Sequence, residues 1–409
     1  MAFDGALWSQ LPLEVVEQIL SFLPMPDLCR YCTICKAWNE LINNPAFSML
    51  HVRNRNKHSP FIAIHSITIS FQNGVYIDGS QVLCFFDISS KKWYSVKPRD
   101  GFETSFLFDT QHFHIVAMDR GLVLLKALKG APKLCHHESG CTQLCVWNPI
   151  KDMKIILPCV LNYDSYSLIN LIVDDIAETF KVFVTKDDSK SRVVDIYDSV
   201  MKEWKASRKF GTNNTRIYIT VQSIVFQNLL YILCFAYDKN RFLQCGQYEL
   251  WRYNHVADNW ERLYLADGCF VERIYRHSDV TIGQLVVSGE RLFVTYWRNI
   301  PQNVFEVHEI DIQRRSTKVL FTWTRTHIMR IFDIDVNVRP SCPSIYVFGF
   351  NKSLMLVSIF SRNIVIFDVE TKESNFEWPK LPLRELRLGE ERYSLIGKQM
   401  DFLLPGTLK

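Results

Sequence analysis

Apolar residues in the first 50 positions follow the spacing of helices. Pro12 suits the first turn of a helix, and four apolar residues then recur on one predicted face: Val16, Ile19, Leu20 and Leu23. Pro24 and Pro26 end that helix because proline lacks the backbone donor that would continue it. A later helix is predicted from the i, i+4, i+7 series Ile34, Trp38 and Leu41. This stretch therefore predicts a small three-helix module.

After residue 60 the pattern changes to short apolar runs that end in a repeated signature. The signature is an apolar residue, then Asp or Asn, a turn, and a Trp six residues after the polar residue. It occurs three times: Asp87 with Trp93, Asp198 with Trp204, and Asn254 with Trp260. Weaker copies without the Trp occur at Asn148, Asp311 and Asp368. The six copies lie 50 to 61 residues apart, which is the period of a kelch-like propeller blade.

Each unit also contains two apolar runs before the signature, so it provides the four strands of a blade. The fold predicted is a small all-α module followed by an all-β propeller of six blades, with a count one higher or lower left open. The predicted boundaries are a helical module over 6–50, a linker over 51–60, a propeller over 61–380 and a tail over 381–409. Within the tail, Arg392 to Leu404 is a candidate strand to close the ring onto the first blade.

Composition narrows the class of protein. The chain has 409 residues, of which 48% are hydrophobic and 22% are charged, as in soluble globular proteins. The sequence has no run of about 18 apolar residues and no secretory signal, so no membrane association is expected. Twelve scattered cysteines then favour reduced thiols in the cytosol or nucleus. The net charge is +4 without a basic run, which argues against direct nucleic-acid binding.

The helical module resembles the F-box, which docks a substrate receptor onto a cullin-RING ubiquitin ligase. The resemblance lies in the order and spacing of Leu11-Pro12, Ile19-Leu20, Leu23-Pro24, Asp27-Leu28 and Ile34-Cys35-Lys36-Ala37-Trp38. It implies docking to a Skp-family adaptor through Leu11, Pro12, Val16, Ile19, Leu20, Leu23, Pro24, Leu28, Ile34, Cys35 and Trp38. The alternative is that these side chains only form the core of a helical bundle.

The body resembles the kelch-type or F-box-associated propellers that follow an F-box in many plant proteins. The segments that carry this resemblance are Arg120-Gly121-Leu122-Val123-Leu124-Leu125 and Val146-Trp147-Asn148-Pro149. Paired kelch glycines are missing, and single ones remain at Gly74, Gly121, Gly289 and Gly349. The closed body would leave the head free to dock.

Recognition of a target is expected at the loops that join second to third strands, because propeller rims vary while the scaffold is rigid. Large or cationic residues of the kind enriched in binding hot spots occur there: Tyr237, Arg241, Phe242, Trp297 and Arg298. These five are the predicted target-binding residues, with ordinary solvated loop residues as the alternative for each.

Metal and catalytic sites are not predicted. Cys29, Cys32 and Cys35 recur every three residues in helical segments, which favours buried thiols. The loop Cys135 to Cys141 with Cys145 beyond it lacks the paired spacing of structural zinc sites, so a polar rim loop is preferred. The motifs of nucleophilic hydrolases, P-loop enzymes, dinucleotide-binding enzymes and zinc proteases are all missing. We therefore predict no catalytic residue, no metal and no cofactor.

The function predicted is a non-catalytic substrate receptor of a Skp–cullin–F-box ubiquitin ligase, located in nucleus and cytoplasm. Its partners would be the Skp adaptor, through it the cullin and RING subunits, and a target protein such as a transcription factor. An alternative is a scaffold or transcriptional cofactor that acts without degradation. A third reading is a propeller that binds a small molecule in its central channel.

Overall fold

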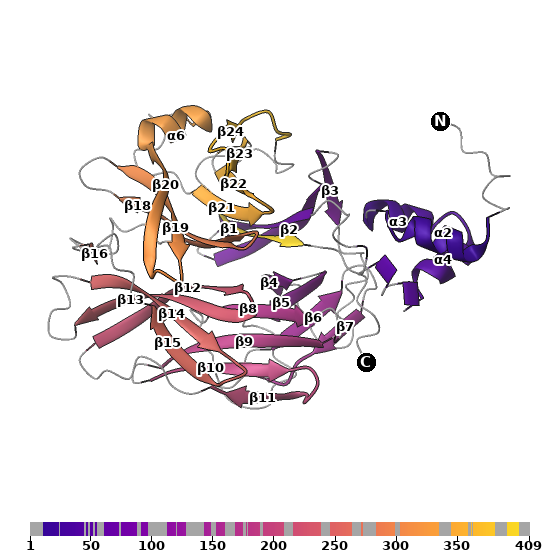
Figure 1. Ribbon diagram of the computed structural model, residues 1–409, viewed down its shortest axis with the longest axis horizontal. Helices are drawn as coiled ribbons and strands as arrows, with labels where there is room; N and C mark the ends of the chain where they lie inside the picture. The colour runs from indigo at the N-terminus through magenta and orange to yellow at the C-terminus, as the bar shows by residue number, and fades with distance from the viewer. Residues whose placement is uncertain are drawn as a thin grey trace.

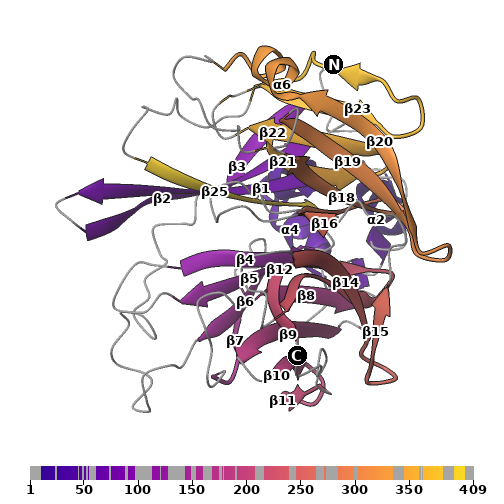
Figure 2. The same ribbon diagram turned by 90° about the vertical axis from the view of Figure 1, so that its left-hand side faces the viewer.

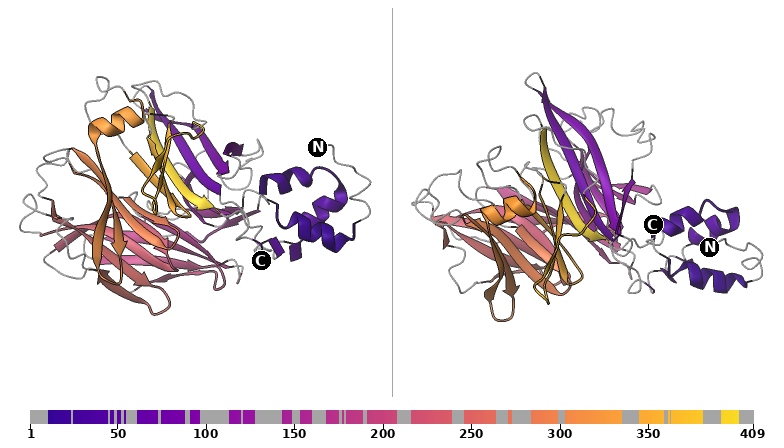
Figure 3. Two further views of the ribbon diagram at one scale, coloured as in Figure 1. Left: turned by 45° about the horizontal axis from the view of Figure 1, so that its top comes forward. Right: turned by 90° about the horizontal axis from the view of Figure 1, so that it is seen from above.

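The computed structural model describes the following residues: 11–23, 25–44, 46–47, 50–51, 54, 61–72, 75–87, 91–96, 113–119, 121–127, 143–148, 153–159, 168–174, 177, 179–188, 191–207, 216–238, 246–263, 271–272, 284–298, 303–334, 345–358, 361, 363–380 and 391–400. A small helical head lies at one side of a body made of strands (Figure 1). Both views in Figure 3 show the same separation. The predicted combination of a small helical module and an all-β propeller is confirmed.

The head, by which we mean the helical residues between 11 and 54, contains three short helices. They are α2 (Leu13–Leu20), α3 (Met25–Tyr31) and α4 (Lys36–Ile42). Pro12 precedes α2 as its N-cap, with the extended backbone that proline favours there, and its carbonyl accepts from Val15 and Val16 N–H. A fourth helix of the described chain, α6 (Arg325–Ile331), belongs to the propeller, where the Thr324 hydroxyl caps it by accepting from His327 N–H.

The described strands form six sheets, in each of which the strands run from the innermost to the outermost in the order that follows. Three of them are β25 (Glu391–Met400), β1 (Phe61–Gln72), β2 (Val75–Asp87) and β3 (Lys92–Val96); β4 (Phe113–Asp119), β5 (Leu122–Ala127), β6 (Leu144–Asn148) and β7 (Met153–Ile156); and β8 (Ile169–Asp174), β9 (Thr179–Asp188), β10 (Ser191–Asp198) and β11 (Glu203–Ala206).

The other three sheets follow in chain order and have the same antiparallel plan. They are β12 (Arg216–Phe226), β13 (Leu229–Asp238), β14 (Gly246–Asn254) and β15 (Asn259–Leu263), with β16 (Val271–Glu272) beside β14; β17 (Gln284–Ser288), β18 (Arg291–Arg298), β19 (Val304–Asp311) and β20 (Ser316–Thr324); and β21 (Ile345–Phe350), β22 (Ser353–Ser358), β23 (Ile364–Asp368) and β24 (Ser374–Asn375). Figure 2 brings these strands toward the viewer, with α2 and α4 of the head behind them.

The repeated polar residue makes the turn between the third and fourth strands. Asp198 Oδ1 accepts from Val200 N–H at 2.9 Å, and Asp368 Oδ1 accepts from Thr371 N–H at 2.8 Å. The fourth residue after the Asp or Asn then adopts a positive φ in five of these turns, between 47° and 62°: Lys91, Lys202, Asp258, Arg315 and Lys372. The same backbone turn therefore recurs from sheet to sheet.

The Trp of the signature packs across the turn, as its spacing predicts. It lies directly opposite the aromatic residue that precedes the Asp or Asn, in three cross-strand pairs: Phe86 with Trp93, Tyr197 with Trp204, and Tyr253 with Trp260. Their ring centroids are 4.8, 5.3 and 4.6 Å apart, within the range of favourable aromatic contacts.

Apolar side chains fill the spaces between successive sheets. Separate buried clusters join the sheet of β4 to that of β8, the sheet of β8 to that of β12, and so on to the sheets of β21 and β1. Innermost strands of five sheets line one central cavity. In the remaining sheet β25 pairs with β1, which brings Met400 opposite Phe61 although the chain between them contains every other strand.

Candidate docking sites on the head and the propeller

Helix α2 carries two neighbouring apolar stripes with opposite exposure. Val16 and Leu20 are 4% and 1% exposed, whereas Val15 and Ile19 are 42% and 37% exposed. Residues four apart lie on one face of a helix, and the two stripes are about 100° apart around its axis. One stripe therefore packs into the head, and the other presents branched apolar side chains on its surface.

More exposed apolar side chains lie before α2 and between α3 and α4. Among the described residues, eleven large apolar side chains are exposed, and five belong to the head although it is a small part of the chain: Leu11, Leu13, Val15, Ile19 and Ile34. Ile34 is 59% exposed and precedes Cys35, the N-cap residue of α4. This concentration is typical of a surface that a partner covers.

The predicted adaptor-docking residues separate into two groups. Leu11, Pro12, Ile19, Ile34 and Cys35 are exposed, and half-buried Leu23 and Trp38 also pack against the head's core. The prediction was wrong in giving Val16, Leu20 and Leu28 direct contact with a partner, because all three are buried inside the head. Pro24 lies outside the described residues. Leu13 and Val15 were missed, although Val15 is one turn before Ile19.

Two further side chains fix the end of α2. The His51 ring lies with Nε2 3.2 Å from the Leu23 carbonyl oxygen, and Asn54 Nδ2 donates to Ser21 Oγ at 2.7 Å. Phe47 stacks on His51 with ring centroids 6.3 Å apart. These contacts tie the residues after α4 back to the turn that follows α2, so the exposed apolar stripe has a rigid support.

The head is not an independent unit on a free tether. One cluster of buried apolar residues contains Leu20, Leu28 and Phe47 of the head together with Met118 and Trp147 of the neighbouring sheet. Such a shared core restricts rotation between head and propeller. The expectation of a head left free by a closed ring is corrected accordingly.

The predicted target-binding residues do not form one exposed set. Trp297 is only 3% exposed, and its ring packs against Phe305 at a centroid distance of 5.4 Å. The prediction of Trp297 as a rim anchor was wrong because β18 continues through Arg298 and Trp297 is a core residue of that strand. Arg241 and Phe242 lie outside the described residues. Tyr237 and Arg298 lie in the last two residues of β13 and β18, and the structure describes only their backbone.

The predicted rim and the head lie at opposite ends of the sheets. Asp87, at the turn between β2 and β3, faces Phe61, the first residue of β1, so the chain enters the propeller beside the Asp/Asn turns. The links between second and third strands leave from the other end because neighbouring strands are antiparallel. In Figure 1 the head accordingly lies on the right, and the ends of β13 and β18 lie toward the left.

The cysteine-rich loop over 135–141 lies outside the described residues. Cys145 beyond it is buried in β6, and desolvation by this burial raises the pKa of its thiol to about 11. A thiol with such a pKa is protonated at neutral pH and is a poor metal ligand. Burial also raises the pKa of Cys32 in the head. Among the residues the structure covers, no three His, Cys, Asp or Glu side chains gather as a metal site would need.

A comparison with protein-family models matches residues 8–49 to the F-box-like family. An F-box protein of Arabidopsis thaliana is 34% identical over 64 residues, which are 16% of this chain and 19% of the relative. An Arabidopsis F-box/kelch-repeat protein is 31% identical over 87 residues, 21% of this chain and 19% of its own. A second F-box/kelch-repeat protein from Arabidopsis is 23% identical over 217 residues, 49% of this chain and 52% of its own.

The chain thus matches about half or less of the length of these curated relatives. Among solved structures, TolB from Acinetobacter baumannii is similar over 87% of this chain and 72% of its own, at a TM-score of 0.43 and 9% identity. Within the described ranges no helix has both the length and the apolar character of a membrane span.

Proposed function

We propose that this chain, a plant-type F-box protein with a C-terminal β-propeller, is the substrate-recognition subunit of a Skp–cullin–F-box ubiquitin ligase. The observation that carries the proposal is the exposed apolar set of the head, Leu11, Leu13, Val15, Ile19 and Ile34, within the residues matched to the F-box-like family. A Skp-family adaptor would cover these side chains, and cullin and RING subunits would join through it.

The receptor itself would perform no chemistry. Its role is proximity, because holding a target lysine near a charged conjugating enzyme raises the effective concentration of the two reacting groups. The shared core between head and sheet supports this role, since a target held by the propeller would keep a defined distance from the docked adaptor. We propose the rim at the second-to-third strand ends, which include Tyr237 and Arg298, as the place where a target protein such as a transcription factor binds.

We also propose that all six sheets form one ring, with the sheet of β25 and β1 as the sixth blade. In support, Trp378 from beyond β24 packs on Phe86 of β2 with ring centroids 5.4 Å apart, and the Trp93 indole N–H points to the Pro379 carbonyl at 3.5 Å. Removal of residues 391–409 should then lower the melting temperature of the whole propeller, because β1 would lose its inner neighbour.

The docking proposal is tested with charge substitutions at exposed apolar sites, which spare the core. Ile34→Asp and Val15→Asp should each weaken binding of a purified Skp-family adaptor at least tenfold, measured by calorimetry with the full chain. Val256→Asp is the matched control, because Val256 is an 84% exposed apolar residue on a propeller turn. Parent-like affinity in both head variants would refute docking through this surface.

A receptor and a scaffold make different predictions for the fate of bound partners. In cells with the tagged full chain, a degraded target should accumulate with the chain after proteasome inhibition, whereas the partner of a scaffold should keep its abundance. We expect the tagged chain in both nucleus and cytoplasm. A partner that does not accumulate would favour the scaffold while leaving adaptor docking intact.

A further inference from the structure

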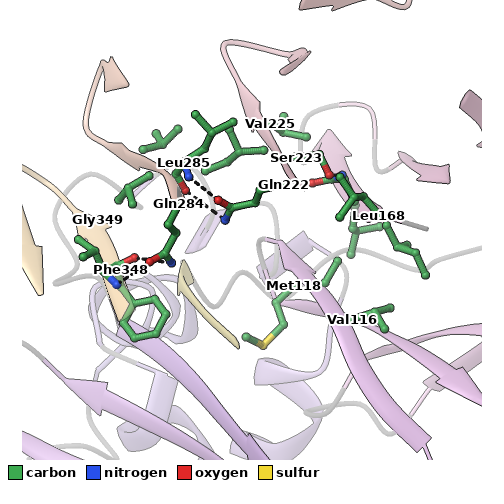
Figure 4. A pocket seen from close by; sticks show the side chains of 18 of the residues that line it. Val116, Met118, Leu168, Gln222, Ser223, Val225, Gln284, Leu285, Phe348 and Gly349 are labelled. Carbon is green, nitrogen blue, oxygen red and sulfur yellow. Dashed lines mark hydrogen bonds between the residues drawn. The ribbon is translucent and has the colours of Figure 1, made fainter. Parts of the chain in front are cut away.

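The central cavity has a volume of about 570 Å³ and an uncharged lining (Figure 4). The innermost strands β4, β8, β12, β17 and β21 supply its walls, and none of the described lining residues is Asp, Glu, Lys, Arg or His. Small-molecule sites in proteins commonly have this size and a mostly apolar wall with few polar groups. An ion would lose its hydration here without a compensating charge, so the lining suits a neutral molecule.

Two glutamines in this wall each bond to the next inner strand through both ends of the amide. Gln284 Nε2 donates to the Val347 carbonyl at 3.0 Å, and Val347 N–H donates to Gln284 Oε1 at 2.9 Å. Gln222 makes the same pair of bonds with the N–H and carbonyl of Leu285 (Figure 4). The inner edge of a strand thus presents a donor and an acceptor that one primary amide satisfies together.

The series begins one strand earlier and is interrupted before that. Asn170 on β8 donates through Nδ2 to Ser223 Oγ on β12 at 2.5 Å. Between β4 and β8, Asp119 Oδ2 accepts from Val173 N–H at 2.8 Å. Two residues upstream on these strands are Ala117 and Leu171. Ala117 therefore occupies the place where the next three inner strands carry an amide, and its methyl group offers neither donor nor acceptor.

The backbone of Leu171 faces this place. Thr185 N–H donates to the Leu168 carbonyl at 2.9 Å, so Leu168 is a hydrogen-bonded partner within the β8–β9 pair. Residues alternate along an antiparallel pair, so every second residue directs its N–H and carbonyl away from the partner strand. Leu171, three residues after Leu168, directs both groups away from β9, toward the cavity that it lines together with Ala117.

We propose that the cavity binds a neutral, largely apolar molecule that carries a primary amide or lactam. Its amide N–H would donate to the Leu171 carbonyl, and its carbonyl would accept from Leu171 N–H beside Ala117, as Gln284 does for Val347. The aliphatic remainder would lie against Val116, Met118 and Leu168. This site is independent of adaptor docking, and either proposal can fail alone.

The first test uses a matched pair of probes, adamantane-1-carboxamide and adamantane-1-carboxylate, titrated into the full chain by calorimetry. They share one apolar cage, and only the carboxamide offers both a donor and an uncharged acceptor. We expect the carboxamide to bind at least tenfold more tightly and to slow hydrogen exchange in β8. Equal affinities, no binding of the carboxamide at millimolar concentration, or protection confined to other strands would overturn the proposal.

The second test gives the protein its own amide. Ala117→Gln should bond to Leu171 and compete with the probe, so that carboxamide affinity falls at least tenfold while the melting temperature is unchanged or higher. Ala117→Ser, which is too short to reach across, should bind within threefold of the parent. Parent-like binding by a folded Ala117→Gln protein would refute the site. If that variant does not fold, the two probes on the unaltered chain still decide.

Discussion

The head and the propeller use apolar side chains in opposite ways. The head buries Leu20 and exposes Ile19, its neighbour on the same helix. The propeller collects its apolar side chains between sheets, and most of its exposed ones lie singly on turns or outer strands, such as Val256 and Val319. Exposure in the head is therefore concentrated where a partner can cover it.

Polar side chains differ in the same two regions. In the propeller they join sheets far apart in sequence, as Gln284 does with Val347 and as the Trp204 indole N–H does with the Pro158 carbonyl at 2.8 Å. In the head the described polar bonds mostly join residues three or four positions apart, with His51 and Asn54 as exceptions. Loss of apolar volume should thus damage the head most, and loss of polar bonds should weaken the propeller.

The largest effect is expected from the buried stripe of α2. Leu20→Ala should cost about 2–5 kcal/mol because it removes buried methyl groups and leaves a cavity. Ile19→Ala should cost well under about 1 kcal/mol, since surface substitutions have small effects. Hydrogen exchange over residues 13–20 in the full chain measures both. Similar losses of protection in the two variants would contradict the assignment of inner and outer stripes.

The next effect concerns the bonds between inner strands. Gln284→Leu removes both partners of the Val347 backbone, and an unsatisfied buried donor or acceptor costs about 1–3 kcal/mol. The melting temperature of the full chain should fall accordingly. Gln313→Leu, at an exposed position of the turn after β19, is the control and should leave it nearly unchanged. A parent-like Gln284→Leu protein would mean that water replaces the amide.

Sequence spacing was sufficient for the repeated turn. An Asp or Asn followed six residues later by Trp predicts a strand end, a turn that bonds its own backbone, and an aromatic pair, and all three occur at Asp198 and Trp204. The left-handed residue at the fourth position was not predicted, because Lys202 and Arg315 carry no side-chain signal for a positive φ. Glycine or asparagine there would have provided one.

The sites were harder to predict, for two physical reasons. Helical spacing placed Val16, Ile19 and Leu20 on one broad face, but only the packing against Phe47 and the rest of the core decides which of them is covered. The inner-strand amides join residues 53 to 63 positions apart. Such pairs depend on the register between sheets, which no pattern within one strand can reveal.

The Trp204 bond between sheets should have a smaller effect. Trp204→Phe keeps an aromatic ring against Tyr197 and loses the indole N–H, so it should cost about 1 kcal/mol. Trp93→Phe should cost less, because its indole N–H is 3.5 Å from the Pro379 carbonyl. Chemical denaturation of the two variants compares them directly. A larger loss for Trp93→Phe would show that ring packing outweighs the hydrogen bond.

The left-handed turn residues offer a stabilising change. Lys202 has φ of 56° and an exposed side chain. Lys202→Gly relieves a left-handed conformation that costs a side-chain-bearing residue about 1 kcal/mol, partly offset by the greater freedom of glycine when unfolded. A gain of a few tenths of a kcal/mol is expected, whereas Lys202→Val should destabilise. Denaturant midpoints of both variants check the sign, and a loss with glycine would contradict it.

The smallest effect is a pH dependence at the junction of two sheets. Burial lowers the pKa of His255, Lys181 lowers it further, and Asp198 opposes the shift. Above about pH 6.5 the imidazole is neutral in both the folded and the unfolded chain, so it contributes no pH dependence. As the pH falls below that value, the unfolded chain binds the proton more readily, and the folded state loses stability. His255→Gln should therefore lose less melting temperature than the parent between pH 7 and pH 5. An identical slope in both proteins would show that His255 stays accessible to protons in the folded propeller.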